Sequence, residues 1–568
     1  MRTPSALKAL GFATLFGFST ITFASPRVSL ASQAQVQPPK HQSVLGAATY
    51  VTMPLRGLTH PKLLWADTEY LAGQGISPDQ ILKKFAYASP VDGESAESYS
   101  NETKIGFVDG NGGIGMNGNF GSGRAATIVE TRAGSASTGQ DWQIKGSGRT
   151  PMVNKDSDQY HRNGASVLGE GIHEAIWGKL LALEMPYGAY RTVAVIATGS
   201  LGVHPKNKTE KFRAGIFEFI DRQAIQHGYA WAHSLFHGGT SPTNAGLDGR
   251  MLDFGTFSAF DGYPNARVID EDGFFGDTEL YKRDLLKDIR DSWVRTLSSD
   301  LLAVLPSEAE WFNRFEATFQ TTRQREMLRL AGAFTEFTSE LMARSEGQRL
   351  AKVLIKIAEA GNTKKIEIWE GQNPFGTGTY NLGKILALAA GESFVNGDVE
   401  NSGLRKLIPE EGQRTEFVDA YVSFLKIERQ LALHVGISPA AETRYRRLAV
   451  KMRNRKMTAV FRLNKNEKHI WKIEADFAAN GDPKPVQSYI DNIISESRRD
   501  FHHVAPYSIV YTEANSKLKN AARVFDAVKN QFVTEPSTDV VRTIPVRASR
   551  LSEKTSAIRC EGLFLKAN

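Results

Sequence analysis

The sequence predicts an α+β fold of two lobes, in which a β-rich first part is followed by a mainly helical second part. Short apolar, β-branched runs bounded by Gly or Ser mark the stretch before residue 220, and such runs are typical of strands. After residue 280 the apolar residues recur at helical spacing, as in Leu286, Ile289, Trp293 and Leu297. A chain of 568 residues, 41% of them apolar, is long enough for two or three domains.

The first residues have the pattern of a secretory signal peptide. An apolar run over 9–23 follows the basic residues Arg2 and Lys8, and the small-residue site T-F-A ends at Ala24. We therefore expect residues 1–24 to be cleaved and the protein to be exported, to the periplasm or out of the cell. An uncleaved anchor or an organellar transit peptide is the alternative, because no acidic residue precedes Asp67. No later stretch is long and apolar enough to cross a bilayer, so we expect no membrane contact after signal removal.

Composition and spacing predict the remaining elements. Ser, Gln and Pro dominate the expected linker at 25–48, and Gly, Ser and Asn dominate 91–124. The expected strands are 126–130, 142–146 and 191–198, with a short β-like run within 211–220. The expected helices are 168–183, 325–360 and 415–435, the last stopped by Gly436. These elements predict a β-rich lobe at 49–220 and a mainly helical lobe at 221–568.

Charge and cysteine content exclude some classes of site. The net charge is +7, and the segment 444–456 holds seven Lys or Arg and no acidic residue. A solvated helix face explains this segment, and a docking surface for an acidic partner is the alternative. It lacks the regular aromatic interleaving that single-stranded nucleic acid requires, so we expect no specific nucleic-acid partner. Cys560 is the single cysteine, so the chain has no internal disulfide and no Cys-based zinc site.

The segment 237–255, HGGTSPTNAGLDGRMLDFG, carries the most informative motif. Asn244 stands nine positions before Asp253, and Asp253 opens a D-F-G tripeptide. Protein kinases hold the Mg²⁺ ions of ATP with an Asn and a D-F-G Asp. The alternative is an ordinary apolar strand that runs into a glycine turn. His233 and His237 have the i, i+4 spacing of zinc helices, but the glutamate of H-E-x-x-H is absent, so we exclude zinc.

Four upstream features have the residue types that nucleotide binding needs, although each also has a plain structural explanation. Gly121, Gly123 and Arg124 suit close approach to a phosphate, or simply a flexible loop. Lys145 ends an apolar strand, where it either reaches a phosphate or lies in solvent. A helix glutamate, Glu174, either pairs with that lysine or lies on the surface. Arg213 contacts phosphate or merely flanks a strand. The order of glycine loop, lysine, glutamate, asparagine and D-F-G aspartate is that of the kinase parts.

These segments together resemble the selenoprotein O family of pseudokinase-like protein adenylyltransferases, with this chain as a divergent member. GSGRA at 121–125 is similar to the family's G-D-G-R-A, and QIKGSGRTP at 143–151 to its Q-L-K-G-(S/A)-G-x-T-P. NGASVLGEGIHE at 163–174 and FRAGIFEF at 212–219 are similar to the next two family elements. HGGTSPTNAGLDGRMLDFG is similar to H-G-V-M-N-T-D-N…D-Y-G without a gap.

The resemblance implies a two-lobed protein-kinase-like fold that binds Mg²⁺ and ATP and transfers AMP to Ser, Thr or Tyr hydroxyls of proteins (AMPylation). It implies that 49–220 is the nucleotide-binding lobe and that 237–255 is the Mg²⁺-binding loop. Glu174 would pair with Lys145, and Asn244 and Asp253 would hold Mg²⁺, for which amide and carboxylate oxygens are suitable ligands. The residues that would contact nucleotide are Gly121, Gly123, Arg124, Lys145, Asn163, Gly164 and Arg213.

The sequence departs from the family pattern at the catalytic base. Thr243 stands where the family has an Asp directly before the metal-binding Asn, and a threonine is no general base near neutral pH. Asp248, in the same loop, is a candidate substitute base. Asn163 replaces a family Asp, and Cys560 does not match the family's C-terminal redox residue. A protein kinase that uses the γ-phosphate, and a catalytically silent nucleotide-binding or interaction protein, are the alternatives to the adenylyltransferase.

Overall fold

A computed structural model describes the chain within one compact unit, Pro38–Asn568. The described residues are 50–90, 96–109, 125–129, 141–151, 164, 166–198, 202–207, 216–237, 249–255, 257–259, 265–270, 273–275, 286–287, 289–291, 294, 302–303, 305–360, 365–369, 382–391, 403–434, 436–454, 467–504, 509–512, 523–526 and 531–533. The predicted signal peptide, the linker and Cys560 lie outside them. Among the helices that are described, none is both long and apolar enough to span a membrane.

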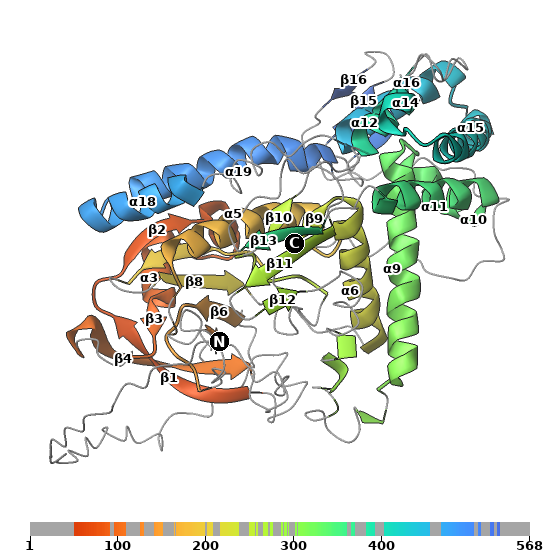
Figure 1. Cartoon of the computed structure of the whole chain (residues 1–568). Helices are drawn as coiled ribbons and strands as arrows, with labels where there is room; N and C mark the ends of the chain where they lie inside the picture. The colour runs from red at the N-terminus through yellow and green to blue at the C-terminus, as the bar shows by residue number, and fades with distance from the viewer. Residues whose placement is uncertain are drawn as a thin grey trace, which may run out of the picture. The chain divides into compact units, whose positions relative to one another are not determined.

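The fold is α+β: an antiparallel sheet region comes first in the chain and a mostly helical part follows (Figure 1). The sheet has eight strands in the order β2-β7-β8-β6-β5-β4-β1-β3. Their bounds are β1 Tyr50–Leu58, β2 Lys62–Ala66, β3 Tyr87–Ala88, β4 Tyr99–Asp109, β5 Ala125–Val129, β6 Asp141–Lys145, β7 Ala194–Ala197 and β8 Gly202–Asn207. The three strands predicted from apolar runs are therefore confirmed as β5, β6 and β7.

Strand β1 shows why these residues pair. Its buried positions alternate with more exposed ones, with Met53 and Leu55 on the buried side. It pairs with β4 in antiparallel register, Tyr50 opposite Asp109. Strand β4 occupies part of the Gly/Ser/Asn-rich stretch 91–124, for which composition alone predicted no strand; the long edge that β1 offers decides its conformation.

In the described part of the chain, the helices beside the sheet are α2 Thr68–Gly73, α3 Pro78–Phe85 and α5 Leu168–Glu184. Helix α3 begins with a capping box between Ser77 and Gln80. Helix α5 was predicted from its apolar spacing, and Ile172, Ile176 and Leu180 are fully buried along it. Because this apolar face packs into the core, the polar residues of α5 lie on its other faces.

Most of the later part of the chain is helical. The bounds are α6 Ile216–Ala232, α9 Glu308–Leu330, α10 Thr338–Ala343, α11 Ser345–Ala360, α12 Leu382–Ala389, α14 Leu404–Leu407, α15 Glu411–His434, α16 Pro439–Arg453, α18 Glu467–Asn480 and α19 Lys484–Val504, with 3-10 turns η3 Ala96–Ser98 and η5 Thr335–Phe337. The helices predicted over 325–360 and 415–435 are confirmed as α9–α11 and α15. Gly436 follows α15 with φ +85°, and its N–H bonds the carbonyl of Leu433, as expected of a helix stop.

Short strands interrupt the helical part, and the sequence analysis did not predict them. They are β9 Leu235–Phe236, β10 Ser258–Ala259, β11 Asn265–Asp270, β12 Gly273–Phe275, β13 Lys365–Trp369, β14 Ile509–Thr512, β15 Arg523–Asp526 and β16 Gln531–Val533. Strand β11 pairs in parallel with β13, about a hundred positions later in the chain. Pairing over such a separation leaves no local signal in the sequence.

The prediction of a β-like run within 211–220 was wrong for its later residues. Ile216 is the first residue of α6, and Phe219 and Ile220 are buried on that helix against Trp311 and Phe315 of α9. The run Ile-Phe-Glu-Phe-Ile fits either period over so short a window. Packing against α9 selects the helix.

The solvated-face interpretation of 444–456 was also wrong for two of its arginines. Arg446 is fully buried in α16 and pairs with Glu442, one turn away. Arg453 is buried too, and its Nη1 donates to the carbonyl of Ala333 at 2.7 Å. These cations bind inside the protein and not to an external acidic partner, because buried charges require partners.

A buried polar network joins the end of α5 to α6 and α9. The hydroxyl of Tyr229 donates to Glu184 Oε1 at 2.6 Å, and His233 Nε2 lies 3.2 Å from Glu326 Oε2. Arg329 Nη1 donates to the other Glu326 oxygen at 3.0 Å. Burial raises the pKa of Glu184 to about 7, Glu326 adds to the rise, and His233 and Tyr229 oppose it.

We expect Glu184→Gln to stabilise the protein at alkaline pH. The folded-state pKa of Glu184 is raised above its ordinary 4.5, so its stabilising contribution is fully present below pH 4.5 and is lost as pH rises through about 7. The amide does not ionise, and it still offers an oxygen to Tyr229. The free energy of unfolding of the variant should exceed that of the wild type by about 3 kcal/mol at pH 8 and by less than about 1 kcal/mol at pH 5.

Urea unfolding at several pH values measures this difference. Glu316→Gln, an exposed change on α9, is the control and should shift stability by no more than about 0.5 kcal/mol. A Glu184→Gln difference that is the same at pH 5 and pH 8 would contradict the prediction.

Candidate functional site

Lys145 is the last residue of β6 and is buried. All five residues of this strand are buried, and β5 and β8 flank it, with Lys145 opposite Ala125 and His204. The lysine side chain is 7% exposed, so the solvent-lysine alternative does not hold. A buried ammonium group needs carboxylate partners.

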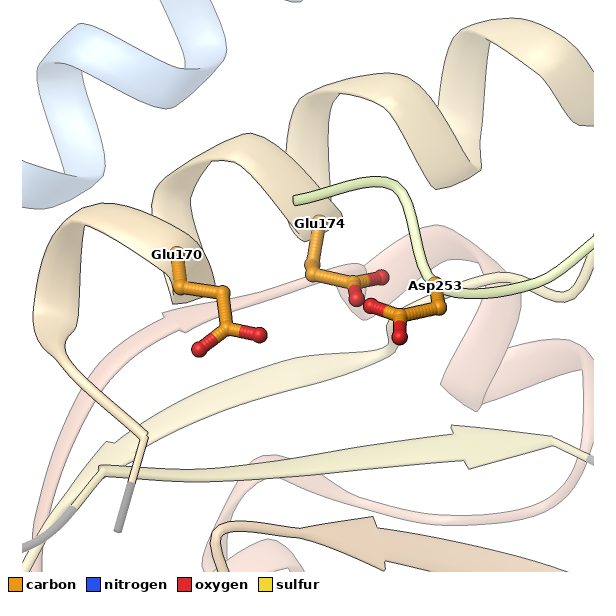
Figure 2. Close-up of side chains that lie close together, drawn as sticks. All are labelled: Glu170, Glu174 and Asp253. Carbon is orange, nitrogen blue, oxygen red and sulfur yellow. The ribbon is translucent and has the colours of Figure 1, made fainter. Parts of the chain in front are cut away.

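Among the described residues, three carboxylates lie around this ammonium group. Lys145 Nζ lies 3.0 Å from Glu174 Oε1 and 2.5 Å from Glu170 Oε1, and it also bonds Asp253 Oδ1. Figure 2 shows that Glu170 and Glu174 project from one helix toward Asp253, which lies on a separate loop segment. We call Lys145, Glu170, Glu174 and Asp253 the lysine–carboxylate cluster. Glu174 is fully buried, so the surface-glutamate alternative is wrong.

Helix α5 and the D-F-G segment hold these side chains in place. Glu170 and Glu174 are four positions apart, which puts them on the same face of α5. The start of α5 is capped from α18, where Glu474 accepts a hydrogen bond from the Gly169 N–H. Trp65 of β2 donates to Asp491 of α19 at 2.9 Å, and Figure 1 shows α18 and α19 beside α5 and β2.

The segment around Asp253 is not the strand that the alternative interpretation predicted. Met251 forms an isolated β-bridge with Ala189, and residues 252–255 belong to no strand. Asp253 has φ +67°, a left-handed conformation that is uncommon for a residue with a Cβ and is concentrated at functional sites. Phe254 is fully buried and packs against His237, whose Nε2 donates to the Leu252 carbonyl at 2.9 Å.

The cluster brings three acidic side chains to one ammonium group in a largely buried place. One oxygen from each of Glu170, Glu174 and Asp253 lies within 4.8 Å of the others. Hard carboxylate oxygens at this spacing fit a Mg²⁺ ion by their chemistry. The Asp253 side chain is 34% exposed, so the cluster is open to solvent on that side.

The glycine predicted at 164 has a clear structural role. Gly164 has φ +79°, and a Cβ there would lie 1.9 Å from the backbone N of Arg149. Its carbonyl accepts from the Gly148 N–H at 3.1 Å, which holds it against the turn that follows Lys145. No other residue fits this contact.

The predicted site residues divide into two groups. Lys145, Glu174 and Asp253 come together in the cluster, and Gly164 lies against the turn that follows Lys145. Eight others lie outside the described residues and stay predictions: Gly121, Gly123, Arg124, Asn163, Arg213, Thr243, Asn244 and Asp248. The histidines excluded as zinc ligands are directed elsewhere, His233 to Glu326 and His237 to a backbone carbonyl.

Glu170 and Glu474 were not predicted. Glu170 stands one helical turn before Glu174, so the i, i+4 spacing was a signal that the sequence offered. Glu474 lies about three hundred positions from Gly169, and nothing in the sequence links them. No protein-family model matches this chain, and no curated protein matches it either. The functional assignment therefore depends on the lysine–carboxylate cluster and on the order of the motifs.

Proposed function

We propose that this chain is a protein adenylyltransferase of the selenoprotein O type, with a two-lobed kinase-like fold, that transfers AMP from Mg²⁺-ATP to hydroxyl side chains of another protein. The contact of Lys145 with Glu174 and Asp253 supports this proposal most directly. The partners are 29 and 108 positions away in the chain and come from a strand, a helix and a D-F-G loop. Kinase-like enzymes take their phosphate-binding lysine, its glutamate partner and a metal-binding aspartate from these elements.

Lys145, Glu174 and Asp253 of the cluster each have a defined task in this reaction. The ammonium group of Lys145 neutralises phosphate charge, and Glu174 keeps it in place. Asp253, together with Asn244, provides oxygen ligands for Mg²⁺. A Mg²⁺ ion held there would supply positive charge that offsets the charge developing on the phosphate oxygens.

The transfer itself breaks one P–O bond and forms another. The hydroxyl oxygen of the substrate attacks the α-phosphorus, the bond from that phosphorus to the bridging oxygen breaks, and pyrophosphate leaves. The hydroxyl proton passes to a base. Thr243 lacks a carboxylate at the family's base position, so Asp248 or solvent takes the proton and the rate is low. Positioning and charge neutralisation provide most of the acceleration.

Two other functions fit the same cluster. A protein kinase would direct the substrate hydroxyl to the γ-phosphorus instead. A catalytically silent nucleotide-binding protein is favoured by Thr243. The predicted export raises a further condition, because ATP is scarce outside the cytoplasm. Either the exported protein works inside a second cell, or residues 1–24 are not a signal peptide, or ATP is not the ligand. ATP labelled at the α- or the γ-phosphate, incubated with the protein and Mg²⁺, distinguishes the three functions by which label reaches protein.

We expect Lys145→Ala to weaken the binding of Mg²⁺-ATP by about 1.5–3 kcal/mol, the range of a charge-assisted hydrogen bond. Asp253→Asn should remove most of the Mg²⁺ dependence of binding, because an amide is a weaker ligand than a carboxylate. Isothermal titration calorimetry measures both affinities.

Lys352→Ala, an exposed change on α11, is the matched control and should bind ATP as the wild type does. Circular dichroism must show that each variant is folded. Unchanged ATP affinity in folded Lys145→Ala and Asp253→Asn proteins would rule out a nucleotide site at the cluster.

A further inference from the structure

Glu170 has no task in the proposed reaction, although it lies as close to Lys145 as the other carboxylates do. Its Oε1 is 2.5 Å from Lys145 Nζ, and its Oε2 accepts from the Ser166 hydroxyl at 2.8 Å. The lysine and glutamate side chains are 7% and 8% exposed. A Cβ on Gly255, the D-F-G glycine, would be 3.4 Å from Glu170 Cγ. The Glu170 side chain is therefore held by Lys145 and by Ser166, and it lies beside the D-F-G loop.

The charge of Glu170 opposes the binding of a bare triphosphate. Glu174 and Asp253 also contact Lys145, so Glu170 is a third acidic side chain at the same ammonium group. A metal-free nucleotide of about four negative charges would be repelled by this carboxylate and would have to compete with it for Lys145. A divalent cation that arrives with the nucleotide would weaken both obstacles, because it neutralises phosphate charge and gives the Glu170 carboxylate an alternative to Lys145.

We propose that Glu170 is a specificity-determining residue that makes the cluster reject metal-free nucleotide and accept the Mg²⁺ complex. This inference rests on the proposed nucleotide site. In the absence of nucleotide, Glu170 keeps the Lys145 ammonium group occupied. When a Mg²⁺-nucleotide binds, the carboxylate turns toward the cation and Lys145 turns toward the phosphates.

The test compares ATP affinity with Mg²⁺ and with EDTA, by calorimetry, in the wild type and in Glu170→Gln. The amide keeps an oxygen for Ser166 and removes one negative charge. We expect the affinity for ATP in EDTA to rise by about tenfold, since a unit charge a few ångströms away is removed from a partly buried site. The affinity for Mg²⁺-ATP should change by less than about threefold. The ratio of the dissociation constant in EDTA to that in Mg²⁺ should therefore fall.

Glu474→Gln is the matched control. It makes the same chemical change beside the same end of α5, but its oxygen bonds the Gly169 N–H and not Lys145. Its ratio of dissociation constants should equal that of the wild type. Ser166→Ala, which removes the hydroxyl that orients Glu170, should lower the ratio by a smaller factor than Glu170→Gln does.

The possible outcomes separate this inference from the proposed function. If Glu170→Gln keeps the wild-type ratio while Lys145→Ala still weakens Mg²⁺-ATP binding, the role of Glu170 is wrong and the nucleotide site stands. If Glu474→Gln lowers the ratio as much as Glu170→Gln does, the effect comes from removing any negative charge near this end of α5, and the inference also fails. If neither the wild type nor Glu170→Gln binds ATP under either condition, both proposals fail together.

Discussion

Replacing Arg446 with alanine should lower the free energy of unfolding by about 3–5 kcal/mol, the usual cost of removing one partner from a buried ion pair. The side chains of Arg446, Glu428 and Glu442 are all fully buried. Arg446 bonds Glu442 and lies 3.9 Å from Glu428 Oε2. Burial raises the pKa of Glu428 to about 7, and Arg446 opposes that rise. Without the arginine, two buried carboxylates would lack their common cation.

Arg447→Ala is the matched control for this experiment, since it removes the same side chain from the next, exposed position of α16. It should change stability by no more than about 0.5 kcal/mol. Urea unfolding at pH 7.5 compares the two variants. A loss below about 1 kcal/mol in Arg446→Ala would mean that the three side chains are not buried together in solution.

These buried arginines show what a count of charges cannot predict. Arg446 bonds Glu442 of its own helix and lies near Glu428 of α15, and Arg453 donates to the carbonyl of Ala333, 120 positions away in the turn after α9. A run of seven basic residues has the same composition whether its side chains reach solvent or buried acceptors. Only the packing of α16 against its neighbours decides between the two.

The fold class could be predicted because it depends on local periodicity. Strands β5–β7 are short apolar runs bounded by Gly or Ser, and helices α5, α11 and α15 carry apolar residues at helical spacing. Strand β4 and the pair of β11 with β13 could not be predicted, because a distant strand edge and not the local residues decides their conformation. The helix that begins at Ile216 was mistaken for a strand because five residues are too few to separate the two periods.

The candidate site was predictable where order along the chain carried the information. Glu174 was expected to pair with Lys145 because their order along the chain is that of kinase parts, and it does. Asp253, which was expected as a Mg²⁺ ligand, also contacts the Lys145 ammonium group. Once Glu174 is placed beside Lys145, the i, i+4 spacing on α5 predicts that Glu170 lies on the same helix face. The cap from Glu474 is a tertiary contact without any motif.

Thr243→Asp should raise the transfer of AMP to protein by about 10²–10⁴-fold, the usual contribution of a positioned general base. The substitution restores a carboxylate directly before Asn244, where the resemblance to the selenoprotein O family implies a base. The gain depends on the other parts of the site, because a loose phosphoryl-type transition state depends mainly on positioning and on metal charge. The cluster of Lys145, Glu174 and Asp253 supplies those parts in the proposal.

Transfer of label from α-labelled ATP to a protein substrate measures this rate, with γ-labelled ATP in parallel. Thr243→Asn is the control, since it has the size of the aspartate but cannot take a proton, and it should be as slow as the wild type. Asp248→Asn should lower wild-type transfer if Asp248 now acts as the base, and should have little effect in a Thr243→Asp background. Transfer of the γ-label alone would favour the kinase. If Thr243→Asp transfers neither label while it binds Mg²⁺-ATP with wild-type affinity, the chain is a silent nucleotide-binding protein. The site would then hold a base, a metal and a nucleotide, but not in a geometry that permits attack.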